Sequence, residues 1–143
     1  MKILVPVDGS KSSLEGAKIG ADLAQAKGAQ VTLLAVIPVY PDIDLEISAR
    51  ARESLGNKLS AQAEQALAQA KGFFAGLTVE SILLSSNDVA DEIVTLAEEG
   101  KFDLIVMGSR GMSTSVPFRL GSVATQVVKY SPCSVYVIKL PVT

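Results

Sequence analysis

The segment from Gly108 to Ser122 combines residue types that suit the binding of a phosphate group. Gly108, Gly111 and Gly121 let the backbone approach a ligand closely and adopt positive φ angles. Gly121 and Ser122 precede a predicted helix, whose free amides and dipole favour an anion. The Ser122 hydroxyl adds a donor and Arg110 adds positive charge. The pattern favours a phosphate site, and a plain loop between a strand and a helix stays open as the alternative.

A second polar turn, Pro6-Val7-Asp8-Gly9, closes the first predicted strand. In an open parallel sheet, ligands bind outside the carboxyl ends of the strands, where the strand order reverses. The ends of the first and fourth strands are therefore the candidate positions for a site. The chain contains no GxxxxGK[ST] motif, and its first turn is not GxGxxG. A P-loop NTPase and a standard Rossmann dehydrogenase are thereby excluded.

Histidine is absent from the chain. Serine and cysteine triads and the usual zinc sites with histidine ligands are therefore excluded. Histidine is also the side chain that ordinarily titrates near neutrality, so a proton-transfer catalyst would need a strongly shifted carboxylate, lysine or tyrosine. The sequence thus favours ligand binding over acid–base catalysis, and no catalytic residue is assigned.

Composition limits the class of protein further. The 143 residues fit one domain, and 48% hydrophobic with 20% charged residues is typical of a folded globular chain. A net charge of −2 argues against a nucleic-acid partner. The single cysteine, Cys133, fits a reducing compartment, and neither a signal peptide nor a membrane span is expected. We expect a soluble cytoplasmic protein.

Apolar runs alternate with segments of helical periodicity along the whole chain. Apolar runs closed by turn residues predict strands, and apolar positions three or four apart predict helices. The predicted strands are 2–7, 30–37, 77–84, 103–107 and 134–139. The first predicted helix ends at Lys27, before Gly28, and the second runs from about Leu45 to Lys71, before Gly72. The third runs from a cap at Asn87 or Asp88 to Gly100, and the fourth contains Val123 to Val128 and ends before Ser131.

This order predicts a single α/β domain over residues 1–143, with a parallel sheet and helices on both faces. Gly16 and Gly20 lie on one face of the first predicted helix. Glycine lowers helix propensity, so this face is expected to pack closely against a neighbouring backbone.

The sequence resembles the universal stress protein family, in its ATP-binding branch. The resemblance covers the whole chain and includes VDGS after the first strand, NDVADEI, DLIVMGSRG and PCSVYVIK. Its specific element is the pattern of glycine, two residues, glycine, nine residues, glycine and serine or threonine, which Gly108, Gly111, Gly121 and Ser122 match. The resemblance implies an open five-stranded parallel sheet of order 3-2-1-4-5, similar to the adenine nucleotide alpha hydrolases.

The resemblance also implies roles for single residues. Pro6 and Asp8 would face the adenosine, with the Asp8 carboxylate toward ribose or adenine; a turn aspartate that caps the first helix is the alternative. Val36 would offer backbone groups to the adenine edge, while its side chain is expected to be a buried strand valine.

On the phosphate side, Gly108 and Gly111 would pass close to ribose and phosphate, and Gly121, Ser122 and Val123 would donate to the phosphates. Arg110 stands where many relatives carry histidine, so it either clamps a phosphate or is a solvated loop charge. The implied ligand is ATP, AMP or ADP. Mg²⁺ would join only through phosphate oxygens, because no carboxylate cluster marks a metal site.

The last predicted strand contains Val135, Tyr136, Val137 and Ile138, apolar on both faces. In the order implied by the resemblance this strand is a sheet edge, and an apolar edge is an aggregation hazard that pairing removes. The resemblance therefore implies a homodimer through this strand.

The sequence fits three functions to different degrees. The favoured one is an adenine-nucleotide-binding regulatory protein of the stress response, a homodimeric switch with at most slow ATP hydrolysis or autophosphorylation. The alternative is a nucleotide-independent interaction or chaperone-like dimer. A phosphoacceptor receiver domain is disfavoured, because only Asp8 follows the first strand and Ser85-Ser86 stand where an aspartate would be needed.

Overall fold

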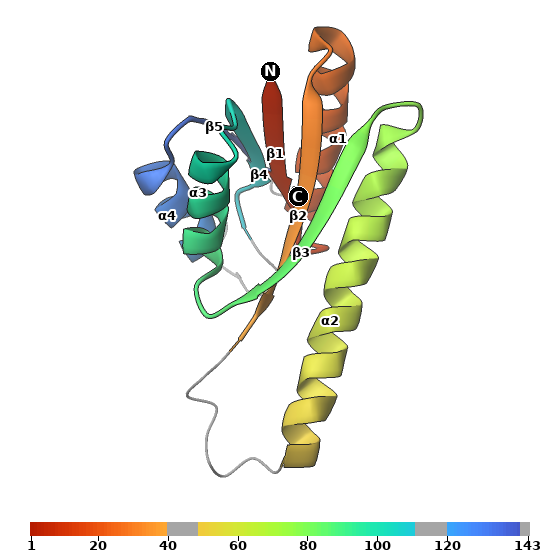
Figure 1. Ribbon diagram of the computed structural model, residues 1–143, viewed down its shortest axis with the longest axis vertical. Helices are drawn as coiled ribbons and strands as arrows, with labels where there is room; N and C mark the ends of the chain where they lie inside the picture. Colours follow the sequence, from red (N-terminus) through yellow and green to blue (C-terminus); the bar gives the residue numbers. More distant parts are fainter. Residues whose placement is uncertain (40–48, 111–119, 141–143) are drawn as a thin grey trace.

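The computed structural model describes residues 1–39, 49–110 and 120–140. In these ranges strands and helices alternate along the chain (Figure 1). The strands are β1 (Lys2–Pro6), β2 (Gln30–Pro38), β3 (Val79–Ser86), β4 (Leu104–Gly108) and β5 (Ser134–Ile138). The helices are α1 (Lys11–Lys27), α2 (Ala49–Lys71), α3 (Val89–Glu99) and α4 (Ser122–Tyr130), with a 3-10 turn η1 (Gly72–Phe74) after α2.

The strands form one parallel sheet in the order β3-β2-β1-β4-β5, which confirms the predicted fold class. β1 occupies the centre and is buried from Ile3 onward, as its continuous apolar run requires of a strand covered on both faces. The chain adds β2 and β3 on one side of β1 and then β4 and β5 on the other. The strand order therefore reverses between β1 and β4.

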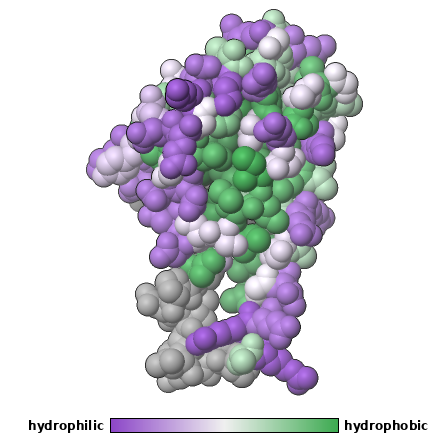
Figure 2. Space-filling model, viewed as in Figure 1, coloured by the Kyte–Doolittle hydropathy of each residue, from purple (hydrophilic) through white to green (hydrophobic). Residues whose placement is uncertain are grey.

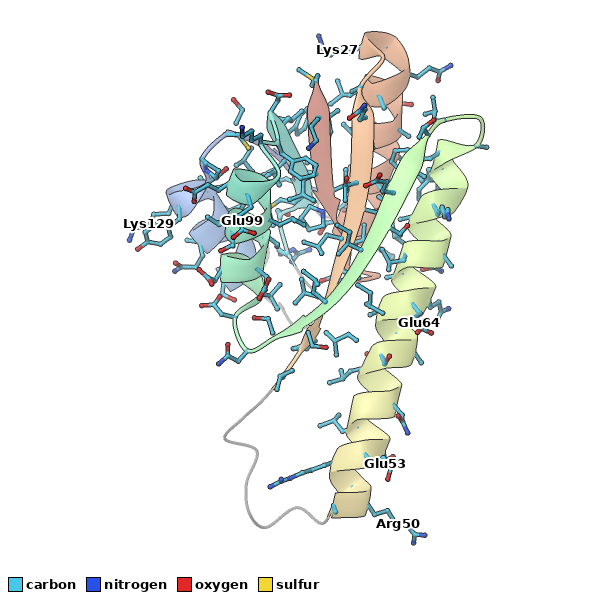
Figure 3. All side chains as sticks on the ribbon, viewed as in Figure 1. Lys27, Arg50, Glu53, Glu64, Glu99 and Lys129 are labelled. Atoms are coloured by element: carbon cyan, nitrogen blue, oxygen red, sulfur yellow. The ribbon has the colours of Figure 1, made fainter. Side chains whose placement is uncertain are left out.

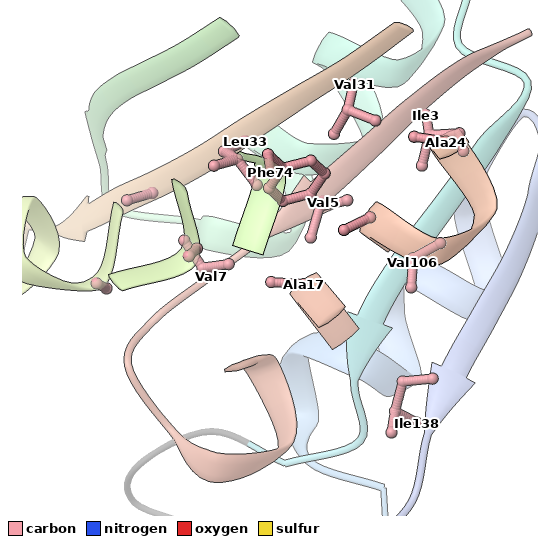
Figure 4. Packing of buried hydrophobic residues seen from close by; sticks show 14 of the residues in the cluster. Ile3, Val5, Val7, Ala17, Ala24, Val31, Leu33, Phe74, Val106 and Ile138 are labelled. Carbon is pink, nitrogen blue, oxygen red and sulfur yellow. The ribbon is translucent and has the colours of Figure 1, made fainter. Parts of the chain in front are cut away.

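Helices cover both faces of the sheet, α1 and α2 on one and α3 and α4 on the other (Figure 1). Under α1 and α2, the ring of Phe74 packs with Val5 and Leu33, all at most 2% exposed (Figure 4). Leu4, Ile93 and Ile105 form the corresponding core under α3 and α4. Each layer buries apolar positions of its helices, such as Ala17 and Ala21 of α1 and Ala124 and Val127 of α4. Val128, in the predicted apolar segment of α4, is instead 49% exposed.

The helices begin and end at residues that are typical helix caps. Ser10 caps α1, with its hydroxyl accepting from the amide of Ser13, and Gly28 ends α1 in the left-handed conformation at φ 64°. Of the two candidate caps for α3, the structure uses Asp88, whose side chain accepts from the amide of Asp91.

The glycine face of α1 lies against the sheet, as predicted. A Cβ atom on Gly16 would lie 3.4 Å from the carbonyl carbon of Met107 in β4. A Cβ on Gly20 would lie 2.9 Å from Cγ2 of Val5 in β1. The first contact is with backbone and the second with a side chain, so β4 is the strand whose backbone α1 approaches most closely at these two positions.

The other strands lie within one residue of their predicted bounds, but two elements differ further. The third strand was expected at 77–84 but runs from Val79 to Ser86, because Gly76 adopts φ 80° and Leu77 closes a turn by donating to the Phe74 carbonyl. Leu77 and Thr78 are both typical strand residues and masked this turn. The long helix ends at Lys71 as expected, but Gly72 continues into η1; residues 45–48 of the predicted helix lie outside the described ranges.

Charged and apolar side chains separate on the surface. Figure 2 shows apolar residues gathered over the middle of the face that β3 crosses, with hydrophilic residues around them. The charged side chains labelled in Figure 3 are all exposed and all belong to helices: Lys27, Arg50, Glu53, Glu64, Glu99 and Lys129. Across the described ranges, no helix combines the length and hydropathy needed to cross a membrane.

Candidate functional site

A cleft opens at the carboxyl ends of β1, β2 and β4, where the strand order reverses. This is the position at which open parallel sheets bind ligands. Its walls are the first turns of α3 and α4 and the turn between β1 and α1. The described lining residues are Pro6, Val7, Asp8, Ser13, Leu34, Val36, Val89, Ile93, Met107, Gly108, Arg110, Gly121, Ser122, Val123 and Ala124.

The structure brings to this one cleft every site residue predicted from the sequence that lies in the described ranges. Asp8 and Arg110 are the charged members among the described lining residues. Gly111, the remaining predicted site residue, lies outside the described residues.

The turn after β1 holds Asp8 at the rim. Gly9 adopts φ 87°, and Asp8 Oδ1 accepts from the Ser10 amide at 2.9 Å. Asp8 therefore stabilises the turn, while Ser10 is the residue that caps α1. Asp8 is exposed and lines the cleft, and a carboxylate can accept several hydrogen bonds. Asp8 can therefore stabilise the turn and contact a ligand at the same time.

The backbone of Val36 is directed toward the cleft. The carbonyl of Leu34 accepts from the Val7 amide at 2.8 Å, so Leu34 faces the side of the sheet occupied by β1. Alternate residues of a strand share an orientation, and Val36 therefore faces the same side, beyond the end of β1 at Pro6. A donor and an acceptor at this position match the edge of a planar heterocycle.

Helix α4 points its amino end into the cleft. The amide of Gly121 donates to the Ser109 carbonyl at 2.7 Å, so this amide is already paired. The next amides, those of Ser122 and Val123, have no acceptor within the helix and carry its positive dipole end. Ser122 is exposed, so its hydroxyl is also accessible. Among the predicted phosphate donors, these two residues have amides that remain open.

Gly108 is required for a reason other than ligand contact. A Cβ atom there would lie 2.6 Å from both the Ser12 carbonyl carbon and the Ser13 amide nitrogen. Real Cβ atoms do not approach backbone that closely. Gly108 lines the cleft, but the absence of a side chain at this position lets the first turn of α1 sit against the end of β4.

Sequence reasoning missed the serines of this turn. Ser10, Ser12 and Ser13 are buried. The hydroxyls of Ser10 and Ser12 donate to the Arg110 carbonyl and so connect the segment after β1 to the segment after β4. Ser13 Oγ accepts from the Asp8 amide at 3.2 Å and donates to the Ser10 carbonyl at 3.1 Å. Three serines within four residues at a helix start were the available signal.

The inner wall of the cleft is apolar. Val89 and Ile93 come from α3, and Met107 comes from β4. The two α3 residues also pack in the core layer under α3 and α4. In the described ranges, no group of three or more metal-ligating side chains is found. The cleft thus combines an apolar wall, a backbone edge at Val36 and an open helix amino end.

An open parallel sheet of this order, with a cleft where the strand order reverses, defines a doubly wound α/β protein. The chain belongs to the universal stress protein family, because the family model matches residues 1–139. It is 36% identical over 142 residues to Universal stress protein MJ0531 of Methanocaldococcus jannaschii, an alignment that covers 98% of this chain and 82% of the relative.

Solved structures share the fold. The structure of the hypothetical protein MJ0577 superimposes with a TM-score of 0.84 at 31% identity, covering 99% of this chain and 97% of the other. A universal stress protein solved in complex with cAMP superimposes with a TM-score of 0.67 at 28% identity, covering 96% of each chain.

Proposed function

We propose that this protein binds an adenine nucleotide, ATP or AMP, in the cleft and acts as a nucleotide-dependent regulator in a stress response. The observation that carries the proposal is the convergence of two unpaired backbone features. The amides of Ser122 and Val123 open the amino end of α4, and the Val36 backbone edge faces the same space. The relative solved with cAMP supports an adenine nucleotide as the ligand class.

In this arrangement the phosphates lie against the first turn of α4, where two amides and the Ser122 hydroxyl donate. The adenine edge pairs with the backbone of Val36, and its faces meet the apolar wall. Asp8 and Pro6 border the ribose. Arg110 contributes a permanent positive charge on the phosphate side. Gly111 belongs to the proposed phosphate segment, as its place in the glycine pattern implies.

The site favours binding over rapid hydrolysis. Asp8 is the carboxylate among the described lining residues, and its Oδ1 is held by the Ser10 amide in the turn. General-base activation of water needs a base within hydrogen-bond reach of the attacking water. We therefore propose at most slow ATP hydrolysis, with any Mg²⁺ held by the phosphates themselves.

We also propose that two copies pair through β5. This strand stands at the sheet edge next to β4, and Tyr136 on it is 44% exposed. An apolar strand edge is removed from water when it pairs with its symmetry mate.

Absorbance and calorimetry test nucleotide binding directly. The chain has no tryptophan and three tyrosines, so co-purified adenine would dominate the spectrum near 260 nm and be released on denaturation. Protein freed of nucleotide should bind AMP or ATP with micromolar affinity, about 8 kcal/mol of binding free energy. Absence of both carried nucleotide and binding heat would overturn the proposal in favour of a nucleotide-independent dimer.

A further inference from the structure

One buried hydroxyl connects the two chain segments that form the rim of the cleft. Ser12 Oγ donates to the carbonyl of Arg110 at 2.7 Å and lies 3.4 Å from the Arg110 amide, which donates to it. The two residues are 98 positions apart. Ser12 is 4% exposed and is not among the described residues that line the cleft. Its side chain therefore acts on the backbone of a cleft residue from outside the cleft.

The segment that Ser12 holds is anchored on two other sides. The amide of Ser109 donates to the Ile138 carbonyl of β5 at 2.9 Å, and the Ser109 carbonyl accepts from the Gly121 amide at 2.7 Å. Ser109 and Arg110 thus connect β5, the start of α4 and the start of α1. The contact to Gly121 is the one that sets where the open amides of α4 begin.

Room for the Ser12 contact depends on Gly108. A Cβ atom at Gly108 would collide with Ser12 Oγ, so the hydroxyl fits only because residue 108 has no side chain. Ser10 Oγ also donates to the Arg110 carbonyl, at the longer distance of 3.3 Å. The Ser12 bond is the shorter of the two and is the one that also involves the Arg110 amide.

We propose that Ser12 is a positioning residue for the phosphate side of the cleft, an inference that rests on the proposed function. By holding the backbone of Arg110, the Ser12 hydroxyl keeps Ser109 in place, and Ser109 in turn orients the first turn of α4. Phosphate donors are then preorganised, which lowers the ordering cost of binding. The adenine side, formed by Val36 and the apolar wall, does not depend on this bond.

The test compares two ligands on the whole protein: AMP, which carries a phosphate, and adenosine, which lacks one. Ser12→Ala should weaken AMP binding by about three- to tenfold, the range of one ordinary hydrogen bond. Adenosine affinity should stay within about twofold, because its contacts lie on the independent side of the cleft. Isothermal titration calorimetry gives both dissociation constants.

The ratio of the two affinities separates positioning from general destabilisation. Partial unfolding lowers the binding-competent fraction for both ligands alike, so it cannot change the ratio. Ser12→Cys, with a weaker donor at the same position, should shift the ratio in the same direction.

Ser131→Ala is the matched control. Ser131 Oγ donates to the Cys133 carbonyl at 2.8 Å and accepts from the Cys133 amide at 3.1 Å, the same two-point contact at the far end of α4. This variant should leave both affinities unchanged. Equal loss of AMP and adenosine binding in Ser12→Ala, or loss of neither, would overturn the role of Ser12. Failure of the unaltered protein to bind AMP would instead overturn the proposed function.

Discussion

The carbonyl carbon of Ser12 would lie 2.6 Å from a Cβ atom on Gly108, so α1 and the end of β4 are as close as a glycine allows. The same helix meets β4 again at Gly16, whose Cβ would lie 3.4 Å from the Met107 carbonyl carbon. Helix α1 therefore lies directly on the backbone of β4. The distance between the two rims of the cleft is fixed by this packing.

Gly108→Ala should destabilise the protein by about 1–3 kcal/mol, the usual cost of overpacking, because the new methyl group meets backbone that cannot rotate away. Urea unfolding monitored by circular dichroism measures the change. Gly56→Ala is the control, and it is expected to raise the stability rather than lower it. A Cβ on Gly56 in α2 meets nothing within 4 Å, so alanine there should stabilise by about 0.4–1 kcal/mol. Equal stability of Gly108→Ala and the unaltered protein would contradict the close packing.

Ser122→Ala should lower AMP affinity by about tenfold, because a hydrogen bond to a charged phosphate is lost. Thermal stability should change little, since Ser122 is exposed and α4 begins from Gly121 without a side-chain cap. Calorimetric titration with AMP provides the measurement. Ser134→Ala, an exposed serine at the start of β5, should bind AMP normally. Unchanged affinity in Ser122→Ala would place the phosphate elsewhere.

Most of the fold could be predicted because its signals are local. The left-handed cap at Gly28, the Asp88 cap and the apolar run of β1 each depend on a few neighbouring residues. The start of β3 could not be predicted, because Leu77 and Thr78 are typical strand residues that the structure leaves outside the strand. The turn at Gly76 decides the boundary, and glycine alone does not show where a turn ends.

The site shows the same division between local and distant causes. Spacing alone selected Gly121 and Ser122, because an anion site at a helix start is a local motif. Spacing could not show that the Gly121 amide is paired with Ser109, nor that Ser12 holds Arg110 across 98 positions. Such partners are determined by the parallel topology, which places β1 beside β4 and brings the segments that follow them together. The serines at 10, 12 and 13 were visible in the sequence, but the pairing of Ser12 with Arg110 was not.

Tyr136→Asp should shift the protein from dimer to monomer, because a charge would be buried where two β5 edges pair. The dissociation constant should rise by about tenfold or more, as for other interface tyrosines. Sedimentation velocity at micromolar concentration distinguishes the two species.

The opposite edge of the sheet supplies the control for this variant. Leu83 on β3 is 38% exposed, close to the 44% of Tyr136. Leu83→Asp should leave the dimer intact if pairing is confined to β5. A monomer in the unaltered protein, or equal dissociation in both variants, would contradict pairing through β5.

Nucleotide affinity should depend on pH only through the ligand. The chain has no histidine, the side chain that ordinarily titrates between pH 5 and 8, and the charged residues among the described lining residues are Asp8 and Arg110. A phosphate monoester gains its second negative charge at about pH 6, and the dianion binds an arginine and a helix amino end more strongly. AMP affinity should therefore rise as the pH increases through 6 and then stay level up to about pH 8, while adenosine affinity stays flat throughout. Titrations of both ligands across this range measure the difference. A pH-dependent adenosine affinity would reveal a titrating group of the protein in the site and contradict this account of the cleft.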